Sequence, residues 1–309
     1  MITHPLSIAQ IVPMTRQKPM LAVAFLALCT LGLSLSAGAQ EATFITFDPP
    51  GSTGTQVNSI NPAGVITGYY FEGNNSHGFL RWRDGTFTKF DGPGGAAFTT
   101  PASINPEGAI TGFYSDASGA QHGFLRARDG TFTTFDGPGS TATVPVSINP
   151  GRAITGYYSD ASGPYHGFLR ARDGTFTTFD VPGAISTVAA SINPEGEIAG
   201  GYTNPNSVYP HGFLRSRDGT LETIDVPGAT YTGPAGINPA GVIAGVYADA
   251  KVVNHGFLRS RHGTFTTFDP PGSVDTYPTS INAAGVIVGN YHKASGIEHG
   301  FLRIPDHDE

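Results

Sequence analysis

Cysteine is almost missing from this chain of 309 residues, which contains only Cys29. That residue lies within the first 39 residues, which we expect to be removed as a leader. The remaining chain then has no thiol and cannot form a disulfide, even in an oxidising compartment. Burial of side chains, and not covalent cross-linking, must therefore hold the fold together.

The first 39 residues differ from everything that follows them. Arg16 and Lys18 precede an apolar run over residues 20–35, and residues 37–39 are Ala-Gly-Ala. Cations, a short apolar run and small residues at a cleavage point are typical of a secretory signal peptide. The run is shorter than the roughly 18 to 20 residues of a spanning helix, which favours cleavage over an uncleaved anchor. We therefore expect residues 40–309 to be secreted or periplasmic, with no stable membrane insertion after cleavage.

Basic side chains are also scarce. The chain has 17 Lys and Arg residues against 24 Asp and Glu residues, and removal of the leader takes away two cations and no carboxylates. The balance becomes 15 against 24, a net charge of −9. Binding of phosphates or anionic lipids needs clustered cations that carboxylates do not oppose. This composition excludes nucleic acid as an expected partner.

No stretch after the leader has helical spacing, and no linker divides residues 40–309, so we predict a single domain. The chain contains six copies of one segment instead, His-Gly-Phe-Leu-Arg. The copies begin at intervals of 45, 44, 45, 44 and 44 residues, at His77, His122, His166, His211, His255 and His299. The sequence is therefore a tandem repeat.

Each repeat contains four short runs of apolar and β-branched residues. In the second copy these are 102–105, 109–114, 122–126 and 131–136. An Asn-Pro-x-Gly turn separates the first two runs, and an Arg-Asp-Gly hairpin turn separates the last two. Four strands in about 44 residues are typical of one blade of a β-propeller.

The distribution of apolar residues supports this fold class over a sheet with one wet face. Phe124 and Leu125 are adjacent, and Phe132 and Phe135 have opposite strand parity, so both faces of the sheet carry apolar side chains. A β-solenoid would favour shorter coils than these repeated hairpins indicate. We predict an all-β propeller whose blades cover one another.

The two ends of the chain complement each other. Residues 43–48 match the fourth run of a repeat but have no hairpin partner before them, whereas the last repeat stops after its third run, at 299–303. Together they make one four-stranded blade. The sequence therefore predicts a monomeric six-bladed β-propeller, closed by the N-terminal strand pairing into the last blade.

The motifs of the first and third runs also carry a resemblance. His-small-Phe-Leu together with Ile-Asn-x-x-Gly-x-Ile-x-Gly resembles the HAF-type extracellular repeat family over essentially the whole chain after the leader. That family typically has Ala after His and often Trp after Leu, whereas this chain has Gly123 and Arg126 at those places in the second copy. The resemblance implies an exported, propeller-like protein of a divergent branch and implies no activity.

The shared polar residues favour structural roles. We expect the six histidines to lie a blade apart, too far to converge on a metal, each with a ring nitrogen bonded to the backbone or to a neighbouring blade. Six asparagines precede the first turn of each repeat and are predicted to cap it: Asn61, Asn105, Asn149, Asn193, Asn238 and Asn282. We assign turn chemistry to the Asp that follows each fourth run. No metal and no cofactor are expected.

The arginine that ends each His-Gly-Phe-Leu-Arg segment could form a basic ring for an anionic ligand. A solvated rim neutralised by nearby carboxylates is the favoured interpretation, because an Asp follows three residues later in four repeats. These arginines are Arg81, Arg126, Arg170, Arg215, Arg259 and Arg303.

The segments in which the repeats differ are better candidates for a site than those they share. The loop after the second run and the link after the fourth run vary widely, and a four-stranded meander places both at the same end of the blade. These segments supply aromatic and polar residues suited to stacking on and hydrogen bonding a glycan or peptide. The candidates are Phe98, Tyr165, Tyr209, Tyr231, Tyr277, Asp275 and His292.

Three functions are compatible with this pattern. The leading hypothesis is an exported ligand-binding or interaction module. An aromatic surface without titratable pairs would favour it, whereas converging Glu, Asp, His or Tyr side chains at the channel mouth would favour an enzyme. The alternatives are an enzyme, such as a lyase or glycan hydrolase with a site at the mouth of the axial channel, and a structural surface protein. No catalytic constellation is recognisable in the sequence.

Overall fold

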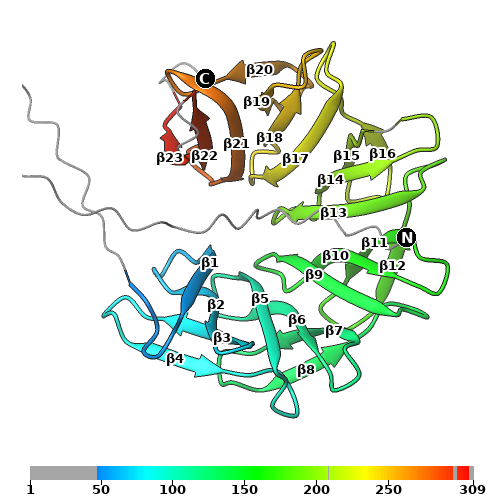
Figure 1. Cartoon of the computed structure of the whole chain (residues 1–309). Helices are drawn as coiled ribbons and strands as arrows, with labels where there is room; N and C mark the ends of the chain where they lie inside the picture. The colour runs from blue at the N-terminus through cyan, green and yellow to red at the C-terminus, as the bar shows by residue number, and fades with distance from the viewer. Residues whose placement is uncertain (1–46, 208, 295–297, 306–309) are drawn as a thin grey trace, which may run out of the picture. The chain divides into compact units, whose positions relative to one another are not determined.

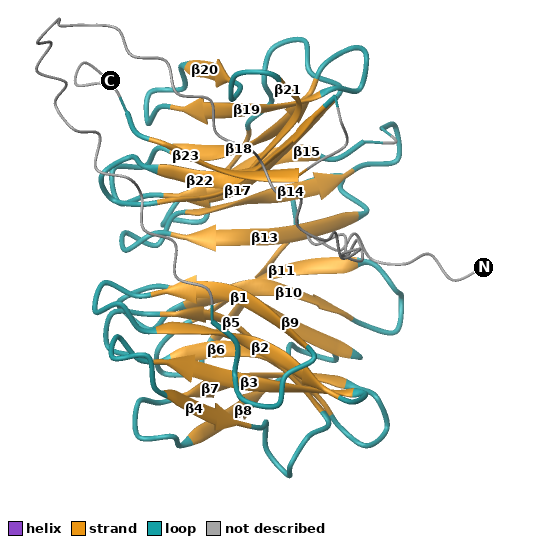
Figure 2. Cartoon of the chain, turned by 60° about the vertical axis from the view of Figure 1, so that its left-hand side comes forward, coloured by secondary structure: helices purple, strands orange, loops and turns teal. Residues whose placement is uncertain are grey.

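A computed structural model of the chain describes residues 47–207, 209–294 and 298–305. These residues belong to one compact unit, Phe47–Glu309. The leader and residues 43–46 of the predicted first strand lie outside the described residues. The described part consists of strands and loops without a helix (Figure 2), so the all-β prediction is confirmed. It accordingly contains no helix long and apolar enough to cross a membrane.

The 23 strands of the described residues form six successive repeats, five of four strands and one of three (Figure 1). Repeat 1 contains β1 (Gly54–Ile60), β2 (Ile66–Glu72), β3 (Asn75–Arg81) and β4 (Phe87–Phe90). Repeat 2 contains β5 (Phe98–Ile104), β6 (Ile110–Ser115), β7 (Gln121–Arg126) and β8 (Phe132–Phe135). Repeat 3 contains β9 (Ala142–Ile148), β10 (Ile154–Ser159), β11 (Tyr165–Arg170) and β12 (Phe176–Phe179).

The later repeats follow the same plan. Repeat 4 contains β13 (Ser186–Ile192), β14 (Ile198–Thr203), β15 (His211–Arg215) and β16 (Leu221–Thr223). Repeat 5 contains β17 (Tyr231–Ile237), β18 (Ile243–Ala248), β19 (Asn254–Arg259) and β20 (Phe265–Phe268). Repeat 6 contains β21 (Ser273–Ile281), β22 (Ile287–Lys293) and β23 (Glu298–Arg303).

Each repeat is an antiparallel meander in which consecutive strands pair. Single parallel bridges, Ser76 to Phe98 and Gln121 to Ala142, join the first three repeats into a twelve-stranded sheet. A meander places alternate connections at opposite ends of its strands. The Asn-Pro-x-Gly and Arg-Asp-Gly turns share one end, here called the constant-turn end. The second-to-third-strand loops and the links between repeats share the other, the variable-loop end.

The hydrophobic core lies between consecutive repeats. Phe124 packs with residues of repeat 1, whereas its neighbour Leu125 packs with Ile154 and Phe168 of repeat 3. Adjacent residues of a strand point to opposite faces, so both faces of the sheet are covered. The prediction drawn from the adjacency of Phe124 and Leu125 is confirmed.

The glycine of the His-Gly-Phe-Leu-Arg segment has a steric cause. A Cβ atom placed on Gly123 would lie 2.6 Å from the ring of Phe135, at the end of the fourth strand of the same repeat. Alanine therefore does not fit unless that ring moves. The large residue at the end of the fourth strand thus explains why this chain has Gly where the HAF-type pattern has Ala.

The repeated asparagines bond within and between repeats. Asn105 Oδ1 accepts the N–H of Ala109 at 2.9 Å, which caps the turn after β5. Its Nδ2 donates to the carbonyl oxygen of Asn149 in the next repeat at 3.4 Å. The same second hydrogen bond is made by Asn61, Asn149, Asn193 and Asn238. In each case Nδ2 donates to the carbonyl oxygen of the corresponding asparagine in the next repeat. The sequence indicated only the turn cap. The hydrogen bonds from one asparagine to the next, here called the asparagine ladder, depend on the tertiary structure.

The interpretation of the arginines as a solvated rim is wrong. Arg126 is 8% exposed, and its guanidinium carbon lies 4.7 Å from the ring centroid of Phe90 in the preceding repeat. Burial lowers the pKa of this guanidinium. Arg170 and Arg215 are equally buried and lie over Phe135 and Phe179. A long aliphatic stem and a planar cation suit a position between packed aromatic rings, which local spacing does not indicate.

Candidate functional site at the variable-loop end

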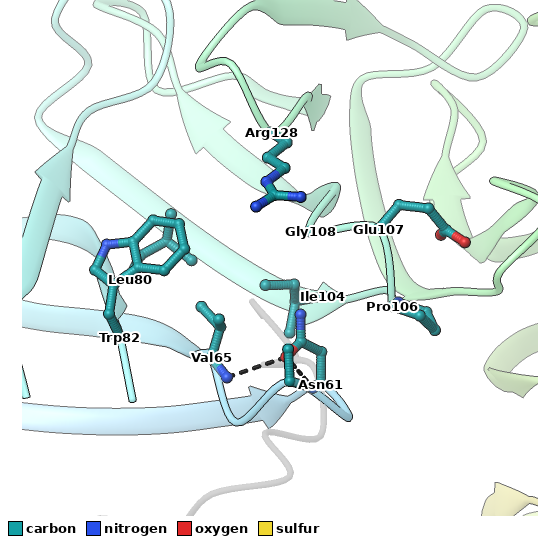
Figure 3. A pocket seen from close by; sticks show the side chains of 10 residues that line it. Asn61, Val65, Leu80, Trp82, Ile104, Pro106, Glu107, Gly108 and Arg128 are labelled. Carbon is teal, nitrogen blue, oxygen red and sulfur yellow. Dashed lines mark hydrogen bonds between the residues drawn. The ribbon is translucent and has the colours of Figure 1, made fainter. Parts of the chain in front are cut away.

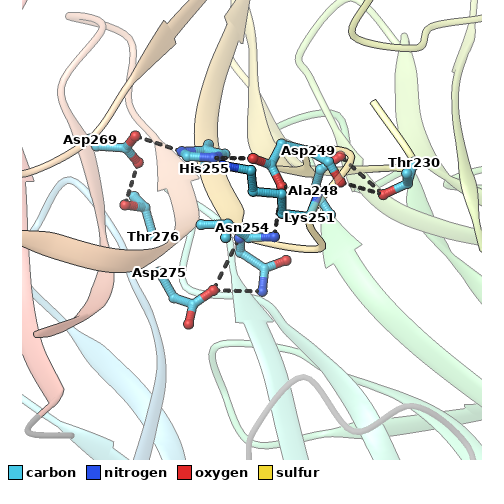
Figure 4. Close-up of polar contacts among 10 residues, drawn as sticks. Thr230, Ala248, Asp249, Lys251, Asn254, His255, Asp269, Asp275 and Thr276 are labelled. Carbon is cyan, nitrogen blue, oxygen red and sulfur yellow. Dashed lines mark hydrogen bonds and ion pairs between the residues drawn. The ribbon is translucent and has the colours of Figure 1, made fainter. Parts of the chain in front are cut away.

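Each described histidine ring of the repeat pairs with an aspartate of its own repeat. His255 Nδ1 lies 2.6 Å from Asp269 Oδ2 (Figure 4), and its ring packs on Tyr247 at a centroid distance of 5.1 Å. Equivalent pairs, each 14 residues apart in sequence, are His77 with Asp91, His122 with Asp136, His166 with Asp180 and His211 with Asp225. His299 belongs to β23, but its side chain is not among the described parts of the structure.

The partner of these histidines therefore differs from the prediction. The sequence favoured a backbone group or a neighbouring blade, whereas the structure pairs each ring with the Asp that follows the fourth strand. The sequence alone indicates only a turn role for that Asp. Strand pairing places the start of the third strand beside the end of the fourth, as in the register of Gly167 with Phe179.

A second carboxylate approaches the other ring nitrogen in repeats 2, 3 and 5. Asp116 Oδ2 lies 3.4 Å from His122 Nε2, and the equivalent distances at His166 and His255 are 3.7 and 3.8 Å. Asp116 also accepts hydrogen bonds from Ser118 and from the N–H of Ala120. These contacts, led by the Ser118 hydroxyl, lower the pKa of Asp116 to about 2.

These carboxylates lie on opposite ring nitrogens and do not converge on one point. Among the described residues, no group of three or more His, Asp and Glu side chains is placed to hold a metal ion. The His–Asp pair also recurs in five repeats with nearly the same geometry. Such repetition indicates that the pair builds each repeat, so a ligand site is expected where the repeats differ.

A polar cluster breaks the repetition where repeats 5 and 6 meet. Asp275 Oδ1 accepts both the backbone N–H and the side-chain Nδ2–H of Asn254, each at 3.0 Å (Figure 4). The Asn254 Nδ2 group also donates to the hydroxyl of Tyr277 at 2.9 Å. One amide thus fixes a carboxylate and a phenol from the neighbouring repeat.

Two further aromatic residues belong to this cluster. The ring of His292 lies 5.8 Å from that of Tyr277 in an edge-to-face arrangement, and His292 is opposite Asp275 in the strand register. The hydroxyl of Tyr231 covers Gly233, where an added Cβ would lie 2.0 Å from it. Burial, and to a smaller extent Tyr277, raise the pKa of Tyr231. We call Tyr231, Asn254, Asp275, Tyr277 and His292 the Asn254 cluster.

The length of β21 positions this cluster. β21 has nine residues, compared with seven in β5, and its register shifts between Ser273 and Asp275. A bulge re-aims the side chains that follow it. Asp275 is thereby paired with His292, next to the start of β19 and its Asn254.

The structure brings together four of the seven residues predicted from sequence, namely Tyr231, Asp275, Tyr277 and His292. The other three lie in different repeats. Phe98 begins β5 and is 47% exposed, Tyr209 lies between β14 and β15 and is 42% exposed, and Tyr165 packs edge-to-face on Tyr157 at 5.0 Å. Asn254 was missed. Its signal was the position just before His-Gly-Phe-Leu-Arg, where every repeat has a different residue.

Comparison with known proteins identifies the fold and no more. No family model matches the sequence, and no curated protein matches it. The β-propeller domain of the Trilobed protease from Pyrococcus furiosus superposes with a TM-score of 0.59 at 10% identity, over 83% of this chain and 82% of that one. A putative TolB from Agrobacterium tumefaciens gives a TM-score of 0.53 at 17% identity, over 82% and 90%.

An enzyme is similar to the same degree. Virginiamycin B lyase from Staphylococcus aureus gives a TM-score of 0.52 at 13% identity, over 79% of this chain and 83% of that one. Identities this low carry the architecture and not the activity. The chain therefore has a β-propeller-like repeat fold.

Proposed function

We propose that this chain is a ligand-binding or interaction module whose ligand contacts the Asn254 cluster at the variable-loop end. The main support is that hydrogen bonds across two repeats hold Asn254, Asp275 and Tyr277 together. A network fixed before the ligand arrives lowers the entropic cost of binding. Its position departs from the repeat pattern, which a purely architectural role does not require.

The chemistry of the cluster suits a glycan or a peptide. Tyr231, Tyr277 and His292 offer aromatic surface for stacking, and Asp275 uses only Oδ1 in its described hydrogen bonds, which leaves Oδ2 to accept from a ligand hydroxyl or amide. A site of aromatic area with a few fixed polar groups is typical of neutral polar ligands.

A glycan and peptide binding screen, followed by titration of each hit, tests this function. Changing Tyr231 or Tyr277 to Ala should weaken a hit by roughly tenfold, since each removes stacking area. Tyr209→Ala is the matched control, because Tyr209 is exposed and lies in repeat 4. A hit that only the Tyr209 change weakened would place the site elsewhere. Turnover of a hit would instead favour the lyase or glycan hydrolase alternative. A screen without hits would favour the structural surface protein.

We also propose that the chain forms a closed six-bladed propeller in which residues 43–48 complete repeat 6. Its support is the position of Phe47 on repeat 1. The guanidinium carbon of Arg81 lies 4.6 Å from the Phe47 ring centroid, as Arg303 lies 5.2 Å from that of Phe268. Phe268 is the last residue of the fourth strand of repeat 5. Phe47 therefore occupies the position of the last residue of a fourth strand that would precede repeat 1.

Asp48 shows the same correspondence. Its Oδ1 accepts the hydroxyl of Thr55 at 2.6 Å, as Asp269 Oδ1 accepts that of Thr276 at 2.6 Å. Asp269 pairs its other oxygen with the histidine of its own repeat, so Asp48 would pair with His299. Ile60 is 62% exposed, whereas its equivalent Ile104 is 6% exposed, so the side of repeat 1 that would meet repeat 6 is open to a partner. The trilobed protease domain has an open velcro topology, which is the alternative.

We further propose that the chain is exported, is monomeric and belongs to the HAF-type family. Export depends on residues 1–39, which lie outside the described residues. The family resemblance depends on the repeated motif, whose Gly and Arg positions have the physical causes given above.

A further inference from the structure

A small cavity lies at the constant-turn end, between repeats 1 and 2 (Figure 3). Its volume is about 70 Å³, and Val65, Leu80 and Ile104 line it with side chains that are 8% exposed or less. A space of this size holds several water molecules or one branched aliphatic side chain. It is at the opposite end of the strands from the Asn254 cluster and has no part in the proposed function.

Trp82 makes this cavity unlike the grooves between the other repeats. It is the only tryptophan of the chain and lines the cavity where the other repeats have Ala127, Ala171, Ser216, Ser260 and Ile304. Its Nε1–H donates to the hydroxyl of Thr88 at 3.0 Å. The indole is therefore held in one orientation with its polar atom satisfied, and it adds an aromatic wall to the aliphatic lining.

Arg128 supplies a cation at the mouth of the cavity. Its stem packs over Gly108, where an added Cβ would lie 3.5 Å from Arg128 Cγ. Figure 3 shows its guanidinium on the cavity side and the carboxylate of Glu107 directed away. Arg128 forms no ion pair with any described residue. A positive charge thus lies beside the apolar side chains of Val65, Leu80 and Ile104.

The groove between repeats 4 and 5 contains an arginine at the equivalent position, paired with a carboxylate. Glu197 takes the place of Val65 there, and Arg261 takes the place of Arg128. Glu197 Oε1 lies 3.7 Å from Arg261 Nη2, and the Glu197 side chain is 17% exposed. In this groove the arginine at the rim forms an ion pair with the carboxylate that the chain supplies. Between repeats 1 and 2, Glu107 lines the cavity but directs its carboxylate away from Arg128, so no described carboxylate pairs with this arginine.

We propose that the Trp82 cavity binds a branched aliphatic carboxylate, presented as the C-terminal residue of a peptide. The aliphatic side chain fills the cavity against Trp82, and the terminal carboxylate pairs with Arg128. A carboxylate gains more from a guanidinium than a neutral amide does, because both partners are charged. The volume admits a side chain such as that of valine.

The single tryptophan makes the test direct, since intrinsic fluorescence excited at the indole reports on Trp82 alone. The probes are acetyl-Gly-Gly-Val with a free C-terminus, the same peptide as its C-terminal amide, and isovalerate. The free peptide should change the emission saturably, and the amide should bind roughly tenfold more weakly or worse. Isovalerate offers the same chemistry without a peptide chain and should bind more weakly than the peptide.

Arg128→Gln should weaken the free peptide by roughly tenfold and leave the amide unaffected. Arg172→Gln is the matched control, because Arg172 is exposed at the same turn position of repeat 3, and it should leave the affinity unchanged. Calorimetry on Trp82→Ala, whose melting curve shows whether it folds, should detect no binding. The proposal is overturned by no saturable change in emission, by equal affinity for the amide, or by unchanged affinity in Arg128→Gln. A tripeptide that bound no more tightly than isovalerate would overturn the peptide assignment.

Discussion

At the scale of single residues, His122 links charge to stability. Partial burial lowers its pKa, but the hydrogen bonds and charges of Asp136 and Asp116 raise it by more, so the pKa of His122 is raised in the folded chain. The pKa of Asp116 is lowered to about 2, first by the Ser118 hydroxyl and also by His122. A charged pair therefore exists over the pH range between these two titrations.

We predict that His122→Gln destabilises the protein more in weak acid than in base. A raised folded pKa contributes stability that is fully present below the unfolded value, about 6.5, and is lost as the pH rises through the folded pKa. The contribution of Asp116 is present above its unfolded value, about 3.9, and is lost as the pH falls toward 2. Urea titrations at about pH 5.5 and pH 9 should show a larger loss at the lower pH.

Gln121→Ala is the control for this measurement, because it changes the adjacent residue and no ionisable group. Its effect on the free energy of unfolding should be the same at both pH values. An equal loss in His122→Gln at both pH values would contradict the link between the pair and stability.

At the scale of elements, the asparagines tie one repeat to the next. Asn149 is 5% exposed, its Oδ1 accepts the N–H of Ala153 at 2.9 Å, and its Nδ2 donates to Asn193 O at 3.1 Å. The first bond closes the turn between β9 and β10. The second joins repeat 3 to repeat 4, so one side chain fixes a turn and an interface.

We predict that Asn149→Ala lowers the free energy of unfolding by about 1 to 3 kcal/mol, because the N–H of Ala153 loses its acceptor and the carbonyl oxygen of Asn193 keeps only the N–H of Gly196 as donor. Urea denaturation followed by circular dichroism measures the loss. Asn206→Ala serves as control, since Asn206 is exposed in the loop after β14, and it should change stability by less than about 0.5 kcal/mol. If Asn149→Ala and Asn206→Ala lowered the free energy of unfolding by similar amounts, the asparagine ladder would not be a specific source of stability.

At the scale of the whole molecule, the proposed closure connects the first and last repeats. Phe47 and Asp48 lie on repeat 1 as Phe268 and Asp269 lie on repeat 6. Repeat 6 has three strands among the described residues. Residues 43–48 would supply the fourth strand and pair with β23.

Deleting residues 40–48 should therefore lower the melting temperature by roughly 5 to 10 °C, because a strand and its packing are lost. Adding a synthetic peptide of residues 40–50 should restore part of that loss. Deletion of residues 306–309 is the control and should leave the melting temperature unchanged. A chain without residues 40–48 that melts like the parent would rule out the shared blade.

The sequence by itself determined the local features of this protein. The interval between histidines gave the length of the repeat, Asn-Pro-x-Gly and Arg-Asp-Gly placed its turns, and the adjacency of Phe124 and Leu125 predicted that both faces of the sheet in repeat 2 are buried. These features depend on neighbours within one strand or one turn, so their spacing in the chain reports them. For the same reason, four residues of the Asn254 cluster could be selected from the variable loops.

The tertiary structure alone decided which distant residues meet. The pairing of each histidine with the Asp 14 residues later depends on strand register, and the burial of Arg126 depends on a phenylalanine of the preceding repeat. Asn254 with Asp275, and Trp82 with Arg128, each come from different repeats. Neither pair has a fixed spacing, because packing of one sheet on the next brings its members together. The proposed sites depend on such contacts, which is why a repetitive sequence could indicate the architecture and not the chemistry.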